Sequence, residues 1–439
     1  MSPTLLLLLL LAQAEGPDVT PETAPVAAAS AEPWHYLVRG EATTLALLPR
    51  GGVGAREGLL QVEPTLIVDG GANWGLNVGA PVRLRLSDGE VGVGLIRRED
   101  WDSLSDWGQL VRALKLGSDA SPVALWVGAL ESYSLLSGHL VRRYSNRANP
   151  DYHPAGAFLT GMLGALYVEA FASDVLGARL MGAQADLDVQ HLFLDRPRQR
   201  GRYTLGLSAV HDWGRAGGST PGVTLAHVDA TAVLVVRPGF EMHMVAGGGG
   251  RPGEGGAWGA VVGMGADALT PTLDLLARLE VRRQYGGFRQ GFFGPDYELA
   301  RFQAVEPSGL PLVEAPFPEG FSAWGEVEVG WDAVQRVGWV QRHLHVSLGV
   351  EVFSWGRVDV DGRVALQLLE RTLEVSVSGL ARGLGQPGAR HLYSGQVRWR
   401  FLGRLYALGG GGTLLFPTPE GTLRPGASAS LGLGVDDVR

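Results

Sequence analysis

The adjacent pair His211-Asp212 has the residue types of general acid–base catalysis, because a histidine beside a carboxylate can activate water or a hydroxyl nucleophile. The pair ends a predicted strand that begins at Tyr203, and adjacent strand residues point to opposite faces. We therefore prefer a solvated pair and keep a hydrolase site as a weak alternative. His343 and His345 share one strand face, but the sequence identifies no third metal ligand. We predict no catalytic, cofactor-binding or metal-binding residues and no cofactor.

Charged residues alternate with apolar ones at many positions, which is the period of a strand with one polar and one apolar face. Leu279 and Val281 share one face of such a segment, and Glu280 lies on the other. If the polar faces point into one enclosed space, they line its wall. The candidate lumen-facing residues are Asp186, Asp188, Asp229, Arg278, Glu280, Arg282, Glu326, Glu328 and Glu351.

Two interpretations of these charges stay open at the level of sequence. In a water-filled pore a ladder of charges tunes ion selectivity, and the excess of acidic residues favours a weak preference for cations. In a closed lumen, opposite charges on neighbouring strands neutralise one another, and each pair contributes roughly 0.2–1 kcal/mol. The register of the strands decides between them, and the sequence does not supply that register.

The segment 286–320 is too long for an ordinary connection and interleaves aromatic residues with arginine. It is predicted to be a loop that is either extracellular or folded into the lumen. There it would bind a ligand or constrict a pore; the alternative is a loop packed on the rim. The candidate constriction or binding residues are Phe288, Arg289, Phe292, Phe293, Tyr297 and Arg301.

The elements that must position these residues are short strands. Alternation recurs along the chain, and turn pairs such as Asp361-Gly362 punctuate it. The spacing of about 10–14 residues suits a tilted transmembrane strand of ~9–11 residues. We therefore predict an all-β fold, a closed antiparallel transmembrane β-barrel of about 16 strands (14–18), with an even number. The glycine runs Gly247–Gly250 and Gly409–Gly412 are interpreted as relief of crowding at a bend or bulge.

Alternation also describes a soluble secreted β protein, and two features favour the membrane barrel. Charged residues make up only 19% of the chain, below the usual ~25%. Tryptophan gathers near predicted strand ends, where a membrane barrel places its aromatic girdles. These tryptophans are Trp213, Trp258, Trp331, Trp339, Trp355 and Trp399.

The N-terminus has the pattern of an export signal, with seven leucines from Leu5 to Leu11 followed by Ala12-Gln13-Ala14. We predict a signal peptide at 1–14, a disordered Pro/Ala-rich periplasmic tail at 15–33 and the barrel at 34–439. The chain has no cysteine, which excludes disulfides and thiolate metal sites. Its net charge of −8 and its lack of basic runs exclude a nucleic-acid partner.

With its signal pattern, alternating strands and interface aromatics from Trp34 to Val435, the chain resembles bacterial outer-membrane β-barrel proteins of the porin-like kind. The resemblance implies localisation in the bacterial outer membrane and contact with its lipid. It also implies insertion by the barrel-assembly machinery and, by analogy, a homo-oligomer. The expected function is a porin-like channel for passive passage of small solutes or ions. The alternatives are a structural, assembly or surface-binding barrel with a plugged lumen, and a hydrolase at the barrel rim.

Overall fold

The computed structural model describes fourteen stretches of the chain with gaps between them. They are residues 35–49, 57–70, 73–87, 95–118, 121–194, 203–214, 222–253, 256–301, 304–305, 310–311, 317–332, 343–369, 372–418 and 422–438. The predicted signal peptide and periplasmic tail therefore lie outside the described residues.

Nearly all described strands belong to one antiparallel sheet in which neighbours along the chain are neighbours in space. In chain order they are β1 (His35–Pro49), β2 (Glu57–Asp69), β3 (Trp74–Gly79), β4 (Val82–Ser87), β5 (Val111–Leu116), β6 (Val123–Gly128), β7 (Gly156–Leu163), β8 (Leu166–Ala172), β9 (Leu180–Asp188), β10 (Tyr203–Asp212), β11 (Val223–Arg237), β12 (Phe240–Gly250), β13 (Trp258–Leu269), β14 (Leu273–Tyr285), β17 (Gly320–Asp332), β18 (His343–Phe353), β19 (Val358–Leu368), β20 (Leu373–Leu384), β21 (Arg390–Leu402), β22 (Leu405–Pro417) and β23 (Leu423–Val438). β1 pairs with both β2 and β23, so the sheet closes into a barrel without edges.

The barrel wall has 20 strands, because β3 and β4 both pair with β2 and act as two halves of one strand. The all-β closed antiparallel fold is confirmed, and the predicted number of about 16 strands was wrong. The physical reason lies in strands that do not alternate. β5 and β6 have six residues each, and β12 and β22 contain the tetra-glycine runs.

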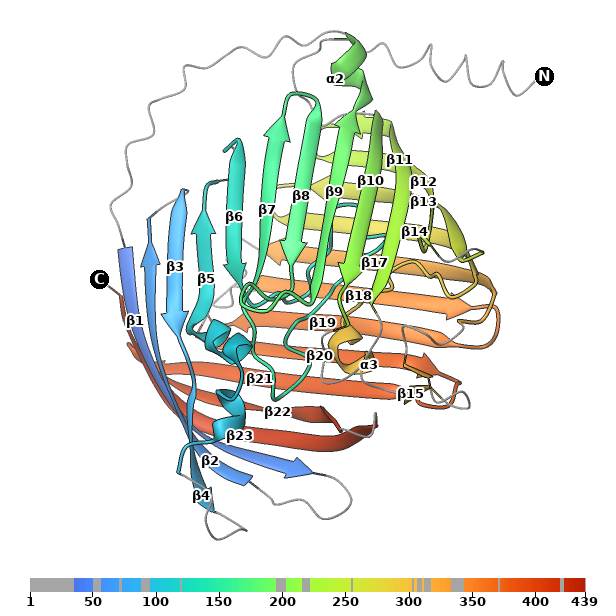
Figure 1. Ribbon diagram of the computed structural model, residues 1–439. Helices are drawn as coiled ribbons and strands as arrows, with labels where there is room; N and C mark the ends of the chain where they lie inside the picture. Colours follow the sequence, from blue (N-terminus) through green and yellow to red (C-terminus); the bar gives the residue numbers. More distant parts are fainter. Residues whose placement is uncertain are drawn as a thin grey trace, which may run out of the picture.

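The two ends of the barrel differ. One end has short connections, such as Gly164-Ala165 and Pro238-Gly239, and it also receives the start of β1 and the end of β23. The other end has the long connections at 88–110, 129–155 and 286–319. In bacterial barrels short turns face the periplasm and long loops face outward. In Figure 1 the short turn between β7 and β8 and the helix α2 after β9 point upward, away from α3.

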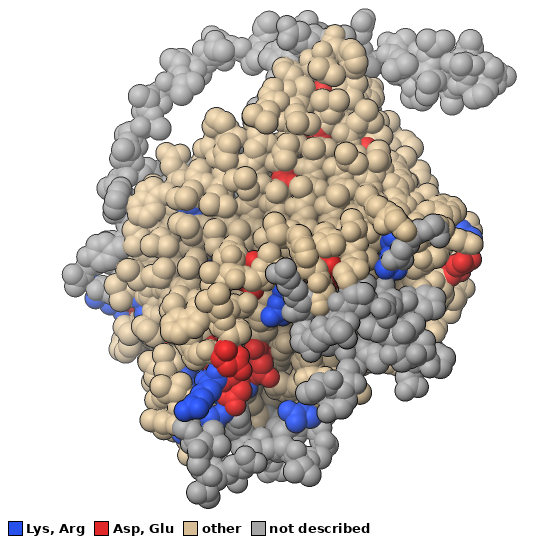
Figure 2. All heavy atoms as spheres, in the orientation of Figure 1, with Lys and Arg blue, Asp and Glu red and all other residues tan. Residues whose placement is uncertain are grey.

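The wall is polar inside and apolar outside, the inverse of a soluble protein. On β14, Leu279 and Val281 are 63% and 54% exposed, whereas Glu280 and Arg282 are 3% and 1% exposed. The same inversion occurs on β23, where Leu431 is 69% exposed. Figure 2 shows few charged atoms over the strands at the front of the molecule, while charges gather toward its lower edge. Such a surface is suited to lipid.

Aromatic residues mark both margins of this surface. Trp213 and Trp258 lie at the end with the long loops, and Trp331 and Trp399 lie near the end with the short turns. All four are partly exposed. This arrangement has the form of two interfacial girdles. Trp339 lies outside the described residues.

Short helices occur only in connections of the described chain: η1 (Arg98–Asp100), η2 (Leu104–Leu110), α2 (Val189–Leu194) and α3 (Tyr297–Ala300). Within the described residues, no helix combines the length and the hydropathy that crossing a membrane as a helix would require. A small hairpin, β15 (Ala304–Val305) with β16 (Leu310–Pro311), follows α3.

Candidate functional site

The connection between β6 and β7, residues 129–155, folds against the inner face of the wall; we call it lumen loop A. Its Tyr133 hydroxyl donates to Glu169 on β8 at 2.5 Å, and its Ser137 hydroxyl donates to Gln184 on β9 at 3.0 Å. Arg143 donates to Ser347 on β18 at 2.5 Å. Lumen loop A therefore contacts strands on well-separated parts of the wall.

The first half of the connection between β14 and β17, residues 286–301, also folds inward; we call it lumen loop B. Arg390 on β21 donates to its Asp296 at 2.5 and 2.8 Å. The next residue, Tyr297, and Arg301 after it both donate to Asp212 on β10. β10 and β21 lie on nearly opposite sides of the barrel, because similar numbers of strands separate them in either direction. Lumen loop B therefore crosses the lumen.

The two lumen loops form one hydrophobic core with the wall. Val141 of loop A forms a parallel bridge with Phe293 of loop B, and the Tyr144 hydroxyl donates to Glu298 at 2.5 Å. Around this bridge the buried apolar side chains come from both loops and from the inner faces of β8, β9, β10 and β11. The loops fill this part of the lumen as a packed plug.

Burial and ion pairing fix the charge states within lumen loop B. Burial alone would raise the pKa of Asp296, but Arg390 and Arg382 outweigh it and hold that pKa well below its ordinary value. Burial raises the pKa of Tyr297 well above its ordinary value; Arg301 opposes this rise and Asp212 adds to it. Tyr297 is therefore a neutral hydroxyl that donates to a carboxylate, and Asp296 is an anion held between two arginines.

The structure places the residues predicted as a constriction or binding loop in lumen loop B, and all of them are buried. These residues are Phe288, Arg289, Phe292, Phe293, Tyr297 and Arg301. The Phe293 ring packs edge-on against both Phe292 and Tyr297, with the Phe293 and Tyr297 ring centroids 4.9 Å apart. The sequence left open whether this segment is extracellular; residues 286–301 lie inside the barrel instead.

Four of the predicted lumen-facing charges come together. Glu280 contacts Arg278 and Arg282 at 2.7 Å each, and Arg282 also contacts Glu351 at 3.1 Å. Arg142 of lumen loop A adds a contact with Glu280 at 3.6 Å. Opposite charges within this group neutralise one another, so they hold loop A to β14 and β18.

The other predicted charges are dispersed. Asp186 and Asp229 flank Gly206 from the strands on either side of β10. Asp188 accepts from the backbone N–H of His191 at 2.9 Å and so lies at the start of α2. Glu326 lies 3.9 Å from Arg143. The half-exposed Glu328 lies 2.8 Å from His345.

His211 and Asp212 do not act together, since they point to opposite faces of β10. His211 contacts Thr224 at 2.8 Å and packs edge-on against Trp213. Asp212 is buried on the inner face with Tyr297 and Arg301. The carboxylate therefore anchors lumen loop B and does not orient the imidazole.

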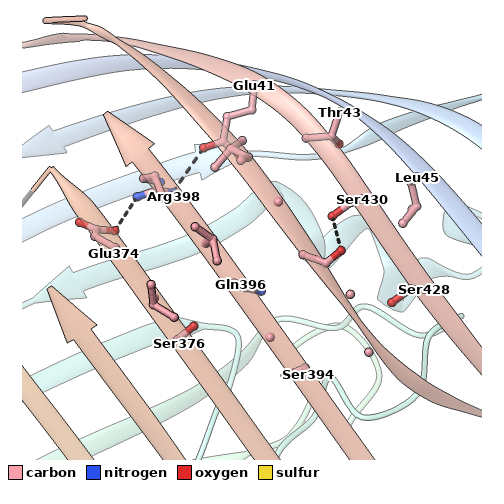
Figure 3. A pocket seen from close by; sticks show the side chains of 18 of the residues that line it. Glu41, Thr43, Leu45, Glu374, Ser376, Ser394, Gln396, Arg398, Ser428 and Ser430 are labelled. Carbon is pink, nitrogen blue, oxygen red and sulfur yellow. Dashed lines mark hydrogen bonds and ion pairs between the residues drawn. The ribbon is translucent and has the colours of Figure 1, made fainter. Parts of the chain in front are cut away.

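The lumen loops leave one part of the interior open. A cavity of about 630 Å³ lies along the inner faces of β19–β23, β1, β2 and β4. Small residues line much of it: Gly410 and Gly412 on β22 face Ser428 and Ser430 on β23. Figure 3 shows Thr43, Ser376, Ser394, Ser428 and Ser430 lining this space. Because these side chains are short, they leave open space beside the inner faces of β22 and β23.

Charges line one side of the cavity in an alternating row. Arg398 lies 3.5 Å from both Glu41 and Glu374, as the dashed lines in Figure 3 show. Arg83 donates to Gln61 at 2.9 Å. Three acidic residues (Glu41, Glu63 and Glu374) face three arginines (Arg83, Arg363 and Arg398). This balance gives no support to the predicted preference for cations.

Sequence analysis missed this cavity. Its charged lining comes from β1, β2, β4 and β19–β21, none of which supplied a predicted lumen-facing charge. One signal was available: the run Gly409–Gly412 was interpreted as relief of crowding at a bend or bulge. β22 pairs in unbroken register with both neighbours at these glycines. The glycines instead leave space on the inner face.

A closed antiparallel wall, an apolar outer surface between aromatic girdles and a polar interior define a porin-like β-barrel of the bacterial outer membrane. No family model matches the chain, and no curated protein matches its sequence.

Among solved structures, the chain is similar to several bacterial proteins. The outer membrane protein OpdK from Pseudomonas aeruginosa has 11% identity and a TM-score of 0.36, covering 93% of this chain and 100% of that one. A BenF-like porin from Pseudomonas fluorescens Pf-5 has 10% identity and a TM-score of 0.35, with coverages of 93% and 100%. The ferric enterobactin receptor PfeA from Pseudomonas aeruginosa, crystallised with enterobactin, has 11% identity and a TM-score of 0.37, with coverages of 91% and 81%. These similarities do not identify a solute for this protein.

Proposed function

We propose that this protein is a passive channel in which small polar solutes or ions pass through the cavity beside the lumen loops. The observation that carries the proposal is the cavity of about 630 Å³ lined by short polar side chains on β20–β23 and β1. A barrel of 20 strands is wide enough to leave an aqueous channel. The lumen loops narrow that channel to the part bounded by the cavity wall.

Planar-bilayer conductance of the refolded chain tests the proposal, with a substitution that narrows the cavity. Ser430→Trp places an indole on the inner face of β23, and we expect it to lower the unitary conductance by roughly half because the ring is large. Leu431→Trp is the matched control: it is the next residue, but it faces outward and is 69% exposed. Equal conductance in both variants would refute a passage along this wall.

A second candidate function is a surface-binding or assembly barrel that conducts nothing. The packed core between the lumen loops and β8–β11 supports it, because it blocks a large part of the lumen. Folded protein with heat-modifiable gel mobility but no current steps would favour this function. Insertion by the barrel-assembly machinery and a homo-oligomer are parts of either proposal, and cross-linking in native membranes would test both.

We propose transport or binding, not hydrolysis. The hydrolase alternative rested on His211 and Asp212, whose side chains lie on opposite sides of the wall. Unchanged hydrolysis in a His211→Ala variant, in any assay that detects hydrolysis, would remove that alternative entirely.

A further inference from the structure

Two histidines and an aspartate meet where lumen loop A touches the wall. His139 lies on loop A, and His227 and Asp229 lie two residues apart on the inner face of β11. All three are buried, and one ligand atom from each lies within 4.8 Å of those from the other two. The rings of His139 and His227 are 4.5 Å apart between centroids. No sequence motif joins them, because the fold brings together residues from distant segments.

These three side chains have unused ligand atoms. His139 Nδ1, His227 Nδ1 and Asp229 Oδ1 are buried and have no hydrogen-bond partner among the described residues. His227 Nδ1 and Asp229 Oδ1 lie 3.6 Å apart, which is too long for a hydrogen bond. A buried polar atom left without a partner costs about 1–3 kcal/mol. Unpartnered polar atoms on all three residues, together with ligand atoms that lie within 4.8 Å of one another, indicate a group that binds between these side chains.

The neighbouring strands make room for this cluster. On β12, a Cβ at Gly247 would come within 2.6 Å of the His227 ring, and one at Gly249 within 2.9 Å of it. On β10, a Cβ at Gly206 would lie 2.8–2.9 Å from the carboxylates of Asp186 and Asp229. β12 shows no irregularity at its glycine run in the described pairing. The run therefore accommodates His227 and is not relief at a bulge, and Gly206 leaves two carboxylates facing one another.

We propose that His139, His227 and Asp229 bind a divalent first-row transition metal of the zinc class and thereby clamp lumen loop A to β11. Two imidazole nitrogens and one carboxylate oxygen are a ligand set that zinc uses with an open fourth position. The negative charge of Asp229, with Asp186 nearby, offsets the charge of the cation.

A side chain outside the cluster orients the imidazole of His227. The Gln290 amide lies 3.2 Å from His227 Nε2, and its Oε1 is otherwise without a partner. In the structure the amide nitrogen of Gln290 faces His227 Nε2; with the amide turned over, Oε1 accepts from Nε2–H and the lone pair of His227 lies on Nδ1, toward Asp229. Burial lowers the pKa of His139 well below its ordinary value, so its imidazole is neutral at neutral pH. This inference does not depend on whether the barrel conducts.

The test is a titration of the folded, EDTA-treated full chain in detergent with CoCl₂, followed by visible absorption, with ZnCl₂ as competitor. We expect one equivalent of Co²⁺ to bind with d–d bands of low coordination number and to be displaced by Zn²⁺. His139→Ala and His227→Ala should each weaken binding at least about tenfold. Asp229→Asn keeps the volume of the side chain, so it tests the site if His227→Ala does not fold.

The matched control is the double variant His343→Ala/His345→Ala, which removes the pair on β18 that lies away from this cluster. Binding that persists in the control and fails in the cluster variants supports the site. Binding that fails in the control, or that survives in His139→Ala and His227→Ala, overturns it. So does absence of binding at millimolar Co²⁺ in protein whose folding is confirmed by heat-modifiable mobility.

Discussion

At the scale of single residues, several buried charges in this barrel are held by partners of opposite sign, and Asp100 is the clearest example. Asp100 is fully buried at the end with the long loops, 2.7 Å from Arg83 and 2.6 Å from Arg97. Burial alone would raise the pKa of Asp100, but His153, Arg83 and Arg97 outweigh it and lower the pKa to about 2. The carboxylate is therefore ionised throughout the ordinary pH range and ties this connection to the wall.

The lowered pKa of Asp100 predicts a particular dependence of stability on pH. Its pKa in the folded chain is below the ~3.9 of the unfolded chain, so its contribution is fully present above about pH 4 and is lost as the pH falls through about 2. We expect Asp100→Asn to lower the free energy of unfolding by about 2 kcal/mol at pH 7, and the gap to close toward pH 2. Denaturant unfolding in detergent across this range measures it.

Asp102→Asn is the control for that measurement, since Asp102 is an exposed carboxylate in the same connection. Burial and the neighbouring Asp106 raise the pKa of Asp102, so removing its charge should not lower the free energy of unfolding at pH 7 as Asp100→Asn does. If the difference in free energy of unfolding between wild type and Asp100→Asn stayed constant from pH 7 to pH 2, this explanation would be contradicted. A difference that does not change with pH cannot come from the charge of the carboxylate.

At the scale of elements, the sequence predicts strands where side chains alternate and fails where they do not. In β14 and β18, where the side chains alternate, Glu280, Arg282 and Glu351 are buried. β12 and β22 do not alternate at their glycine runs. On β12 the glycines leave room for the His227 ring, and on β22 they line the open cavity. Room for a distant side chain is a tertiary property and leaves no periodic signal.

For a similar reason, the sequence did not decide whether lumen loop B folds into the barrel. Its aromatic and arginine content marked it as a loop with a role, but its destination depends on Asp212 of β10 and Arg390 of β21. These partners can be recognised only once the strand order is known, because that order places β10 and β21 across the lumen from one another. Lumen loop A supplies Leu135, Leu140 and Val141 to the buried core, and the strands that bury them are also distant in the sequence.

Releasing one anchor of lumen loop B should open the channel. Asp296→Asn removes the ion pairs with Arg390 and Arg382 while keeping the side-chain shape. We expect larger or more variable unitary currents, because the loop end near β20 and β21 loosens; breaking a buried pair costs about 3–5 kcal/mol. Glu319→Gln makes the same change at an exposed position of the same connection and should leave the currents as they are. Identical currents in all three proteins would show that loop B does not limit passage.

At the scale of the whole molecule, the inverted wall is the property that composition and alternation predict best. The outer face needs only apolar residues at every second position, and that requirement is local to each strand. The inner face is different, because its chemistry depends on which strands lie opposite and on which loops fold inward. This is why the sequence predicted the class of protein while the cavity along β19–β23 and β1 was found only in the structure.

The inverted wall predicts that the cost of an outward charge depends on its depth in the membrane. Leu279 lies at the middle of β14 and is 63% exposed, while Leu269 lies at the end of β13 near the short turns and is 67% exposed. We expect Leu279→Arg to lower the free energy of unfolding in lipid vesicles by about 2–4 kcal/mol and Leu269→Arg by only about 0–1 kcal/mol, because the interface solvates the guanidinium. In a soluble protein two leucines of equal exposure would tolerate arginine equally. Equal costs at the two positions would therefore argue against a lipid-facing wall, whereas a gradient between them would measure where the middle of the membrane lies on this barrel.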